Sequence, residues 1–358
     1  LLVAGLSLAI LFVAIFAGVA TGDTGALWVG FAFLAAATAF AFFQVPYVAM
    51  PAELTQAYGE RTRLMAWRIA VLALAILVSG ALAPLIRDAA GGGIAGHRWM
   101  GLFVAALIAA GALGAFAGTR GAPTGVVTAR EASLARQLRT ACTNPSFIRL
   151  LRCFVVQSAG IGAMLAGVQY FADHVLHRHN ATTILFACFV GPALLVMPLW
   201  TWAGDRLGKK RAFSCASGLF AIGALALAAA QAVGPVAVYL ATILIGCGYA
   251  GQQVFALAML PDCIAYDEAR TGRRQAGVFT GLWTAGETFG LALGPGIFGL
   301  VLQAFGYLPS STGAAVPQSS RAELGVLLGF TVLPGVVVGA ALVLMRGYDL
   351  TAEKLATR

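Results

Sequence analysis

The carboxyl group of Glu287 lies about eleven residues into a long apolar block at residues 276–304. At a rise of about 1.5 Å per residue, a helix formed by this block would hold Glu287 near the middle of a lipid bilayer. An acid at that depth costs free energy unless it faces a cavity, pairs with another group or stays protonated. We therefore predict that Glu287 binds and releases a proton. The alternative is a neutral carboxyl that only hydrogen-bonds a neighbouring helix.

Other polar side chains within apolar blocks are suited to binding a polar solute. Gln157, Gln169 and Tyr170 lie in the block at 147–172 and could form hydrogen bonds with such a solute. Polar residues in helix bundles often serve only to hold helices together, so that role stays open. Trp283, one turn before Glu287, could stack on a sugar ring. The glycines around Glu287 permit close contact between helices.

The sequence lacks the motifs of most other chemistries. It has no Walker A sequence and no GxSxG, HExxH or dinucleotide-binding pattern, so we predict neither an enzyme nor a cofactor. Three of the four histidines fall in DHVLHRH (173–179), but no further ligand accompanies them and we predict no metal site. The six cysteines are scattered without paired spacing, which favours reduced thiols.

The elements that must position Glu287 are transmembrane helices. The chain is 60% hydrophobic and 10% charged, with a mean hydropathy of +0.87, and its apolar blocks are long enough to cross a bilayer, which takes about 20 helical residues. These blocks lack the alternation of barrel strands, so the predicted fold is an all-α membrane protein. Ten spans are predicted, at about 1–20, 27–50, 66–87, 99–118, 147–172, 181–203, 212–232, 235–260, 276–304 and 325–345.

Basic residues fix the predicted orientation of these spans. Nineteen of the 23 lie in or beside the connections at 51–65, 119–146, 204–211 and 261–275 or at the C-terminus, while four lie on the other side. By the positive-inside rule, the first side and the C-terminus are predicted to be cytoplasmic. The net charge of +9 therefore reflects membrane topology, and no nucleic-acid partner is predicted.

The long connection at 119–146 divides the chain into a four-helix bundle at 1–118 and a six-helix bundle with a short tail at 147–358. A weak internal repeat supports an equal division. PAELTQAYGERTRLMAWR at 51–68 and PDCIAYDEARTGRRQAG at 261–277 share a proline, acids and an Arg-Thr pair, 210 residues apart. Parallel six-helix repeats belong to a large class of transporters, so we expect two further helices before Leu1.

Several motifs resemble known transporters. GDRLGKKR (204–211) resembles the signature of the major facilitator superfamily, although Thr201 replaces its leading glycine. VPYVAMPAELTQAYGERTRLMAWR (45–68), NPSFIRLL (144–151) and LPDCIAYDEARTGRRQAGVFTGLW (260–283) are similar to segments of the glycoside–pentoside–hexuronide:cation symporter family, to which melibiose permease belongs. This resemblance implies a major facilitator fold with ten of its twelve helices present, in bundles of four and six.

The resemblance also implies a function and further site residues. It implies alternating-access symport of a sugar or glycoside with a cation, by a monomer in the bacterial inner membrane. Arg68 matches a family arginine linked to the sugar site, and Thr288 stands where many relatives carry lysine. Gln44 replaces a family carboxylate and cannot neutralise Na⁺, which favours a proton carried by Glu287. The full predicted substrate set is Gln44, Arg68, Gln157, Gln169, Tyr170, Trp283 and Thr288.

Charged residues near the connections are predicted to form salt bridges between the bundles that hold one state of the carrier. This predicted gating set comprises Glu53, Arg61, Arg63, Asp205, Arg206, Asp262, Asp267 and Arg273. Two alternatives to sugar symport stay open. One is a carrier or exporter of an amphiphilic, lipid-like or drug-like solute, and the other is a non-transporting membrane receptor or a membrane-embedded enzyme.

Overall fold

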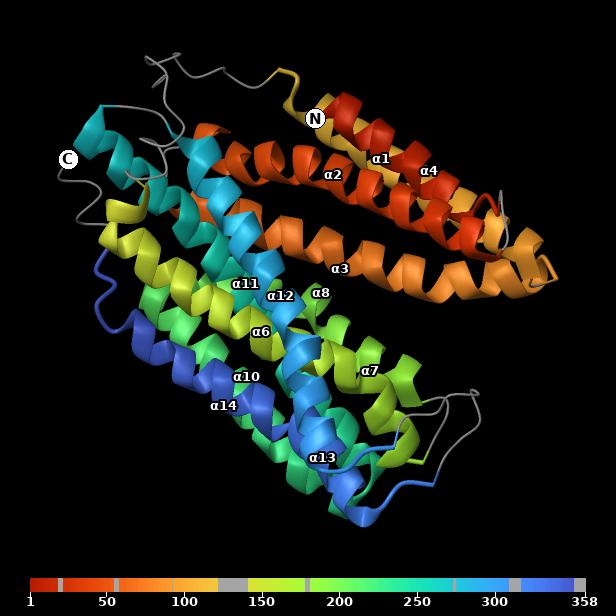
Figure 1. Ribbon diagram of the computed structural model, residues 1–358. Helices are drawn as coiled ribbons and strands as arrows, with labels where there is room; N and C mark the ends of the chain where they lie inside the picture. The colour runs from red at the N-terminus through yellow and green to blue at the C-terminus, as the bar shows by residue number, and fades with distance from the viewer. Residues whose placement is uncertain are drawn as a thin grey trace. The chain divides into compact units, whose positions relative to one another are not determined.

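The computed structural model describes residues 1–18, 22–54, 58–91, 93–121, 141–177, 181–272, 275–308 and 317–350. Within these ranges the secondary structure is helical, without a strand, which confirms the predicted all-α class (Figure 1). The helices are α1 (Leu2–Phe16), α2 (Gly22–Leu54), α3 (Tyr58–Ala89), α4 (Gly93–Thr119), α6 (Pro145–His174), α7 (Ala181–Val190), α8 (Pro192–Leu195), α9 (Met197–Leu207), α10 (Lys209–Val233), α11 (Pro235–Thr271), α12 (Ala276–Ala304), α13 (Ser320–Phe330), α14 (Val332–Ala341) and the 3-10 helix η1 (Leu342–Met345).

Each of the ten predicted apolar segments coincides with one helix or a run of short helices. Of the described helices, eight are long and apolar enough to span a membrane, and α13, α14 and η1 together form the last of these. The segment predicted at 181–203 is a pair of apolar segments, Ala181–Leu195 and Met197–Leu207, that bends by 55° between α8 and α9 and counts as a ninth span if the pair crosses as one. The first segment is α1, a shorter apolar helix of 15 residues.

Two expected loops are largely helical. Residues 261–275 were expected to connect two spans, but α11 continues through Pro261 to Thr271. The helix then ends at Gly272, whose left-handed conformation (φ 67°) favours glycine and whose N–H donates to the Glu268 carbonyl at 2.8 Å. Residues 51–65 were also expected to be a loop, yet α2 runs to Leu54 and α3 begins at Tyr58.

The chain forms two compact units. The first comprises Leu1–Gln56 and Leu74–Val127, and the second comprises Ala57–Ala73 and Thr128–Arg358. In the first unit, α1 packs against both α2 and α4. Trp28 donates to the Ala14 carbonyl at 2.9 Å, and Arg98 donates to the Ala17 carbonyl at 2.7 Å, so side chains of α2 and α4 both hold the end of α1.

The second unit is built on two closely packed helix pairs, α6 with α12 and α10 with α11, and α14 packs on both α6 and α10 (Figure 1). Its apolar core joins aromatic side chains from four helices, with Phe171 of α6 stacked on Phe330 of α13 and with Phe220 and Phe298 beside them. This core fixes the helices that carry Gln157, Trp283 and Glu287.

Candidate functional site

The contact between α6 and α12 sets which side chains of α12 face the interior of the second unit. A Cβ atom added at Gly290 would lie 2.5 Å from the Val155 carbonyl oxygen, so only glycine permits this approach of the two backbones. About two turns earlier, the Trp283 ring is fully buried and stacks on Phe154 with ring centroids 4.3 Å apart. Trp283 is therefore packed within its own unit.

Several buried polar atoms in this part of the second unit have no hydrogen-bond partner among the described residues. They are Gln157 Oε1, Gln253 Oε1, Trp283 Nε1, Thr284 Oγ1 and both side-chain polar atoms of Gln252. An unsatisfied buried donor or acceptor costs about 1–3 kcal/mol, and native proteins contain few of them. The six such atoms on α6, α11 and α12 therefore lower the stability of the folded chain at this place.

These side chains lie at one depth along the helices. Gln157 donates to Ser217 Oγ of α10 at 3.0 Å. The preceding residue in the chain, Ala216, touches α11, because a Cβ atom at Gly251 would lie 2.7 Å from its Cβ atom. Gln252 directly follows Gly251 and is 1% exposed. The polar residues of α6, α10 and α11 therefore share a level.

Glu287 belongs to the same region. It is half-buried and is the twelfth of the 29 residues of α12, so helix geometry places it about 17 Å from the start of that helix. The residue before it, Gly286, touches α6 two residues before Gln157, because a Cβ atom added there would lie 2.8 Å from Val155 Cγ2. On α11, Gln253 donates to the Tyr249 hydroxyl at 2.8 Å. Arg68 is half-buried in the part of α3 that belongs to the second unit.

We use the name polar layer for the residues that meet at this level. They come from four helices, α6, α10, α11 and α12, and are Gln157, Ser217, Tyr249, Gln252, Gln253, Trp283, Thr284 and Glu287. The layer combines hydroxyl, amide and indole groups with one carboxyl group. Such a set can donate and accept several hydrogen bonds at once, and it can bind a proton at one position.

Other predicted substrate residues do not belong to the polar layer. Thr288, next to Glu287, is exposed, and Gln44 is half-buried on α2 in the first unit. Gln169 is twelve residues beyond Gln157 on α6, where it donates to Asp173 at 2.7 Å and accepts from Thr182 at 3.0 Å.

Tyr170 lies with Gln169 in a separate network at the end of α6. Its ring packs against Phe298 and Tyr307. The Tyr307 hydroxyl lies 2.9 Å from His174 Nε2. Burial, followed by the nearby Tyr170 and Asp173, raises the pKa of Tyr307, so this phenol stays protonated at neutral pH. The structure thus separates Gln169 and Tyr170 from the polar layer along the same helix.

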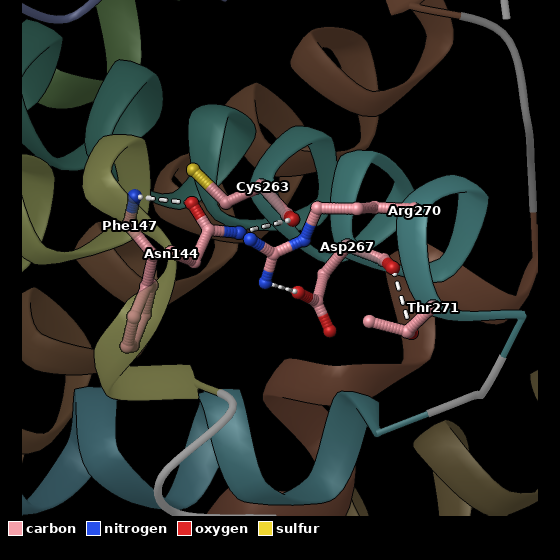
Figure 2. A network of polar contacts seen from close by, with 6 residues as sticks. All are labelled: Asn144, Phe147, Cys263, Asp267, Arg270 and Thr271. Atoms are coloured by element: carbon pink, nitrogen blue, oxygen red, sulfur yellow. Dashed lines mark hydrogen bonds and ion pairs between the residues drawn. The ribbon is translucent and has the colours of Figure 1, made fainter.

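The opposite end of α6 carries a second polar region, in which buried charges are paired. Lys209 and Asp262 are almost fully buried and form an ion pair of 2.6 Å between α10 and α11. Asp267 pairs with Arg270 at 3.1 Å on α11, and Asn144 donates to the Cys263 carbonyl while its Oδ1 accepts from the Phe147 N–H (Figure 2). These contacts fasten α6, α10 and α11 together.

This pairing bears on the predicted gating set. The partners described for Asp262 and Asp267 lie in the second unit itself. Arg63, Asp205 and Arg206 are exposed, and the Arg206 guanidinium lies 5.1 Å from the centre of the Trp202 ring. The side chains of Glu53 and Arg61, and Arg273 as a whole, lie outside the described residues.

Sequence reasoning missed part of the polar layer. Gln252 and Gln253 form a polar pair within the apolar block at 235–260, which was a readable signal. Ser217, Tyr249 and Thr284 gave no comparable signal, because single hydroxyl groups are common in transmembrane helices. Among the described residues, no group of three or more His, Cys, Asp or Glu side chains could hold a metal ion.

Comparison with known proteins identifies the family. A family model described as MFS/sugar transport protein matches residues 1–352. The chain belongs to the MFS/sugar transport protein family. This agrees with the resemblance to the glycoside–pentoside–hexuronide:cation symporters, and it makes the chain an integral membrane protein of the major facilitator superfamily.

Individual relatives agree with this family. The chain is 30% identical to the uncharacterized symporter YnaJ of Bacillus subtilis (strain 168) over 57% of its length and 43% of that protein. It is 21% identical to the isoprimeverose transporter of Lactiplantibacillus pentosus over 90% of its length and 67% of that protein. The matches to YnaJ and to a Synechocystis symporter cover less than half of those relatives.

A solved structure supports the fold of this family member. The crystal structure of a bacterial homologue of the iron transporter ferroportin, in an outward-facing state, matches with a TM-score of 0.66 at 14% identity. The match covers all of this chain and 84% of the other. At this identity the likeness concerns the fold alone, and the major facilitator fold that was predicted is confirmed by the family match together with it.

Proposed function

We propose that this MFS/sugar transport family member carries a sugar or glycoside across the membrane by alternating access, together with a cation that is most simply a proton. One observation carries the proposal: buried donors and acceptors that have no hydrogen-bond partner among the described residues gather around Glu287 at mid-depth of the second unit. The naming of one relative as an isoprimeverose transporter, and of others as symporters, supports both the solute class and the coupling.

The chemistry of the polar layer suits a solute rich in hydroxyl groups. Each sugar hydroxyl donates one hydrogen bond and accepts others, and a glutamine amide can satisfy both demands. Gln252 offers its whole amide, Gln157 and Gln253 each offer a carbonyl oxygen, and Trp283 offers an N–H donor. Because these groups are already desolvated, a hydroxylated solute would satisfy them at little additional cost, whereas an apolar solute would leave them unpaired.

Glu287 is the proposed site of cation coupling. When it is ionised, its charge near the middle of a membrane span is unfavourable unless Arg68 or a bound cation compensates for it. A proton removes that charge, and the two bundles can then move around the occupied site. Gln44, which replaces the carboxylate of related symporters, offers no charge for Na⁺. We therefore propose proton coupling, in a monomer of the bacterial inner membrane with its C-terminus in the cytoplasm.

The test is transport by the protein reconstituted in vesicles. With Glu287→Gln, uptake driven by an imposed pH gradient should fall at least 10-fold, while exchange of labelled for unlabelled glycoside across the membrane continues. Glu323→Gln, on the first turn of α13, is the matched control and should keep driven uptake. Driven uptake that survives in Glu287→Gln contradicts the coupling role, and glycoside exchange that is absent from the unmodified protein contradicts the solute class.

A second candidate function, transport of an amphiphilic solute, has one observation in its favour. The first unit carries an open groove of about 700 Å³ between α1 and α2, lined by apolar side chains that include Phe31, Leu34 and Phe42. Uptake of a fluorescent alkyl amphiphile by the same vesicles, competed by long-chain alkyl glycosides but not by free sugars, would favour this function. Competition by free sugars would favour the first.

A further inference from the structure

One end of the second unit gathers five basic residues on three elements. Arg149 and Arg152 lie on the first two turns of α6, Lys210 and Arg211 lie at the start of α10, and Arg346 follows η1. Four of the five side chains are exposed, and Lys210 is half-buried. We call these five residues the basic patch.

The C-terminal segment holds the patch together. Arg149 donates to the Gly347 carbonyl, and its guanidinium packs directly on that residue, since a Cβ atom at Gly347 would lie 2.8 Å from Arg149 Cζ. Lys210 donates to the Tyr348 carbonyl at 2.6 Å and to the Arg346 carbonyl at 3.2 Å. Tyr348 itself is buried, which anchors the segment. The charges of Arg149 and Lys210 therefore converge on one short stretch of backbone, to which Arg346 belongs.

Among the described residues, no acidic side chain pairs with the charges of the patch. Its hydrogen bonds go to backbone carbonyls, and within the described ranges none of the five residues forms an ion pair with a carboxylate. Elsewhere the described cations Lys209, Arg270 and Arg87 do pair with aspartates. Asp349 is the nearby acid, and it accepts a hydrogen bond from Ser146 at 3.4 Å. The patch thus concentrates positive charge that forms no ion pair within the described part of the chain.

The depth of the patch matches the headgroup layer of a membrane. Trp202 is 52% exposed and carries Arg206 over its ring, near the end of α9. Exposed tryptophans of this kind lie at the membrane–water interface. Lys210 and Arg211 follow across the single-residue turn at Gly208, so they lie within one helical turn of the same level.

We propose that the basic patch binds the headgroup of an anionic phospholipid. Guanidinium groups present forked donors that match phosphate oxygens, and basic clusters at the ends of transmembrane helices recognise anionic lipids. The bound lipid would bridge α6, α10 and the C-terminal segment, and so stabilise the end of the second unit at which Lys209 and Asp262 are buried.

The test measures lipid binding and needs no transport. For the purified protein in neutral detergent, phosphatidylglycerol should raise the midpoint of thermal unfolding by several degrees, and phosphatidylcholine should not. In Arg152→Gln/Arg211→Gln, which breaks no hydrogen bond of the described residues, the rise should shrink at least twofold, and native mass spectrometry should detect less phosphatidylglycerol retained. Arg149→Gln/Arg346→Gln should lose more of the rise, because it removes the guanidinium that packs on Gly347 together with the charge of the neighbouring Arg346.

The matched control is Arg63→Gln/Arg120→Gln, which removes two exposed charges outside the patch. It should respond to phosphatidylglycerol as the unmodified protein does. An equal loss in the control, or an undiminished response in Arg152→Gln/Arg211→Gln, would overturn the proposal. So would an equal rise with inorganic phosphate alone, because free anion binding would then account for the patch.

Discussion

The second unit contains two buried polar regions with opposite character. At the end of the second unit that carries the basic patch, here called the basic end, Lys209 and Asp262 pair at 2.6 Å. There Asn144 donates to the Cys263 carbonyl and accepts from the Phe147 N–H. In the polar layer, Gln252 makes no hydrogen bond within the described residues, and the Trp283 N–H has no acceptor there. Paired groups stabilise the fold, whereas unpaired ones lower stability and are retained when a ligand needs them. Asp267 departs from this division, because its Oδ2 atom is unpaired although Oδ1 binds Arg270.

The largest expected effect is on stability at the basic end. Lys209→Met should lower the free energy of unfolding by about 3–5 kcal/mol, because it leaves the buried carboxylate of Asp262 without its ammonium partner. Lys209→Met/Asp262→Leu should recover most of that loss, since an apolar pair of similar size no longer buries a charge. Thermal unfolding in detergent measures both, with the exposed Asp205→Asn as control. A double variant as unstable as the single one would show that the unpaired charge of Asp262 is not the main cause of the lost stability.

Much of the fold was predictable because the length of each apolar block can be counted in the sequence. The block at 276–304 matches α12 from its first to its last residue, and the position of Glu287 in the middle of a helix followed from counting alone. The continuation of α11 through Pro261 was not predictable in this way, since a proline among charged residues usually marks a loop. Burial of Asp262 against Lys209 makes that extra length stable, and the contact joins residues 53 positions apart.

The candidate site was predicted less completely, for a physical reason. Gln157 and Trp283 were named because polar and aromatic residues stand out in apolar blocks, and both belong to the polar layer. Gln169 stood out equally, yet Asp173 and Thr182 hold it in another network. Whether a polar residue is paired depends on neighbours from other helices, and the spacing along one helix carries no information about them.

An intermediate effect is expected where the polar layer meets the solute. Gln252→Leu replaces an unpaired amide by an apolar side chain of similar size, so the unfolding temperature should stay the same or rise. The apparent affinity for a glycoside should fall about 10-fold, which corresponds to about 1.4 kcal/mol. Competition binding and thermal unfolding on the same preparation check the two parts. Lower stability with unchanged affinity would place Gln252 among the structural groups, and it would break the contrast between the two regions.

The smallest expected effect compares two buried tryptophans of the second unit. Trp200 donates its indole N–H to the Cys247 carbonyl at 2.9 Å, whereas the Trp283 N–H has no acceptor in the described part of the chain. Substitution by phenylalanine removes the N–H from each and keeps an aromatic ring, so the loss of apolar contact is similar. Trp200→Phe should therefore destabilise the protein by about 1 kcal/mol more than Trp283→Phe, since only Trp200 loses a hydrogen bond.

For glycoside binding, we expect Trp283→Phe to have the larger effect of the two variants. Trp283→Phe should weaken it several-fold by removing a donor from the polar layer, and Trp200→Phe should leave it unchanged. Calorimetric unfolding and equilibrium binding of both variants measure the two orders. If Trp283→Phe proved the more destabilising of the two and bound glycoside normally, the unpaired N–H would have no part in solute recognition. The proposed site would then be confined to Glu287 and the glutamines of α6 and α11.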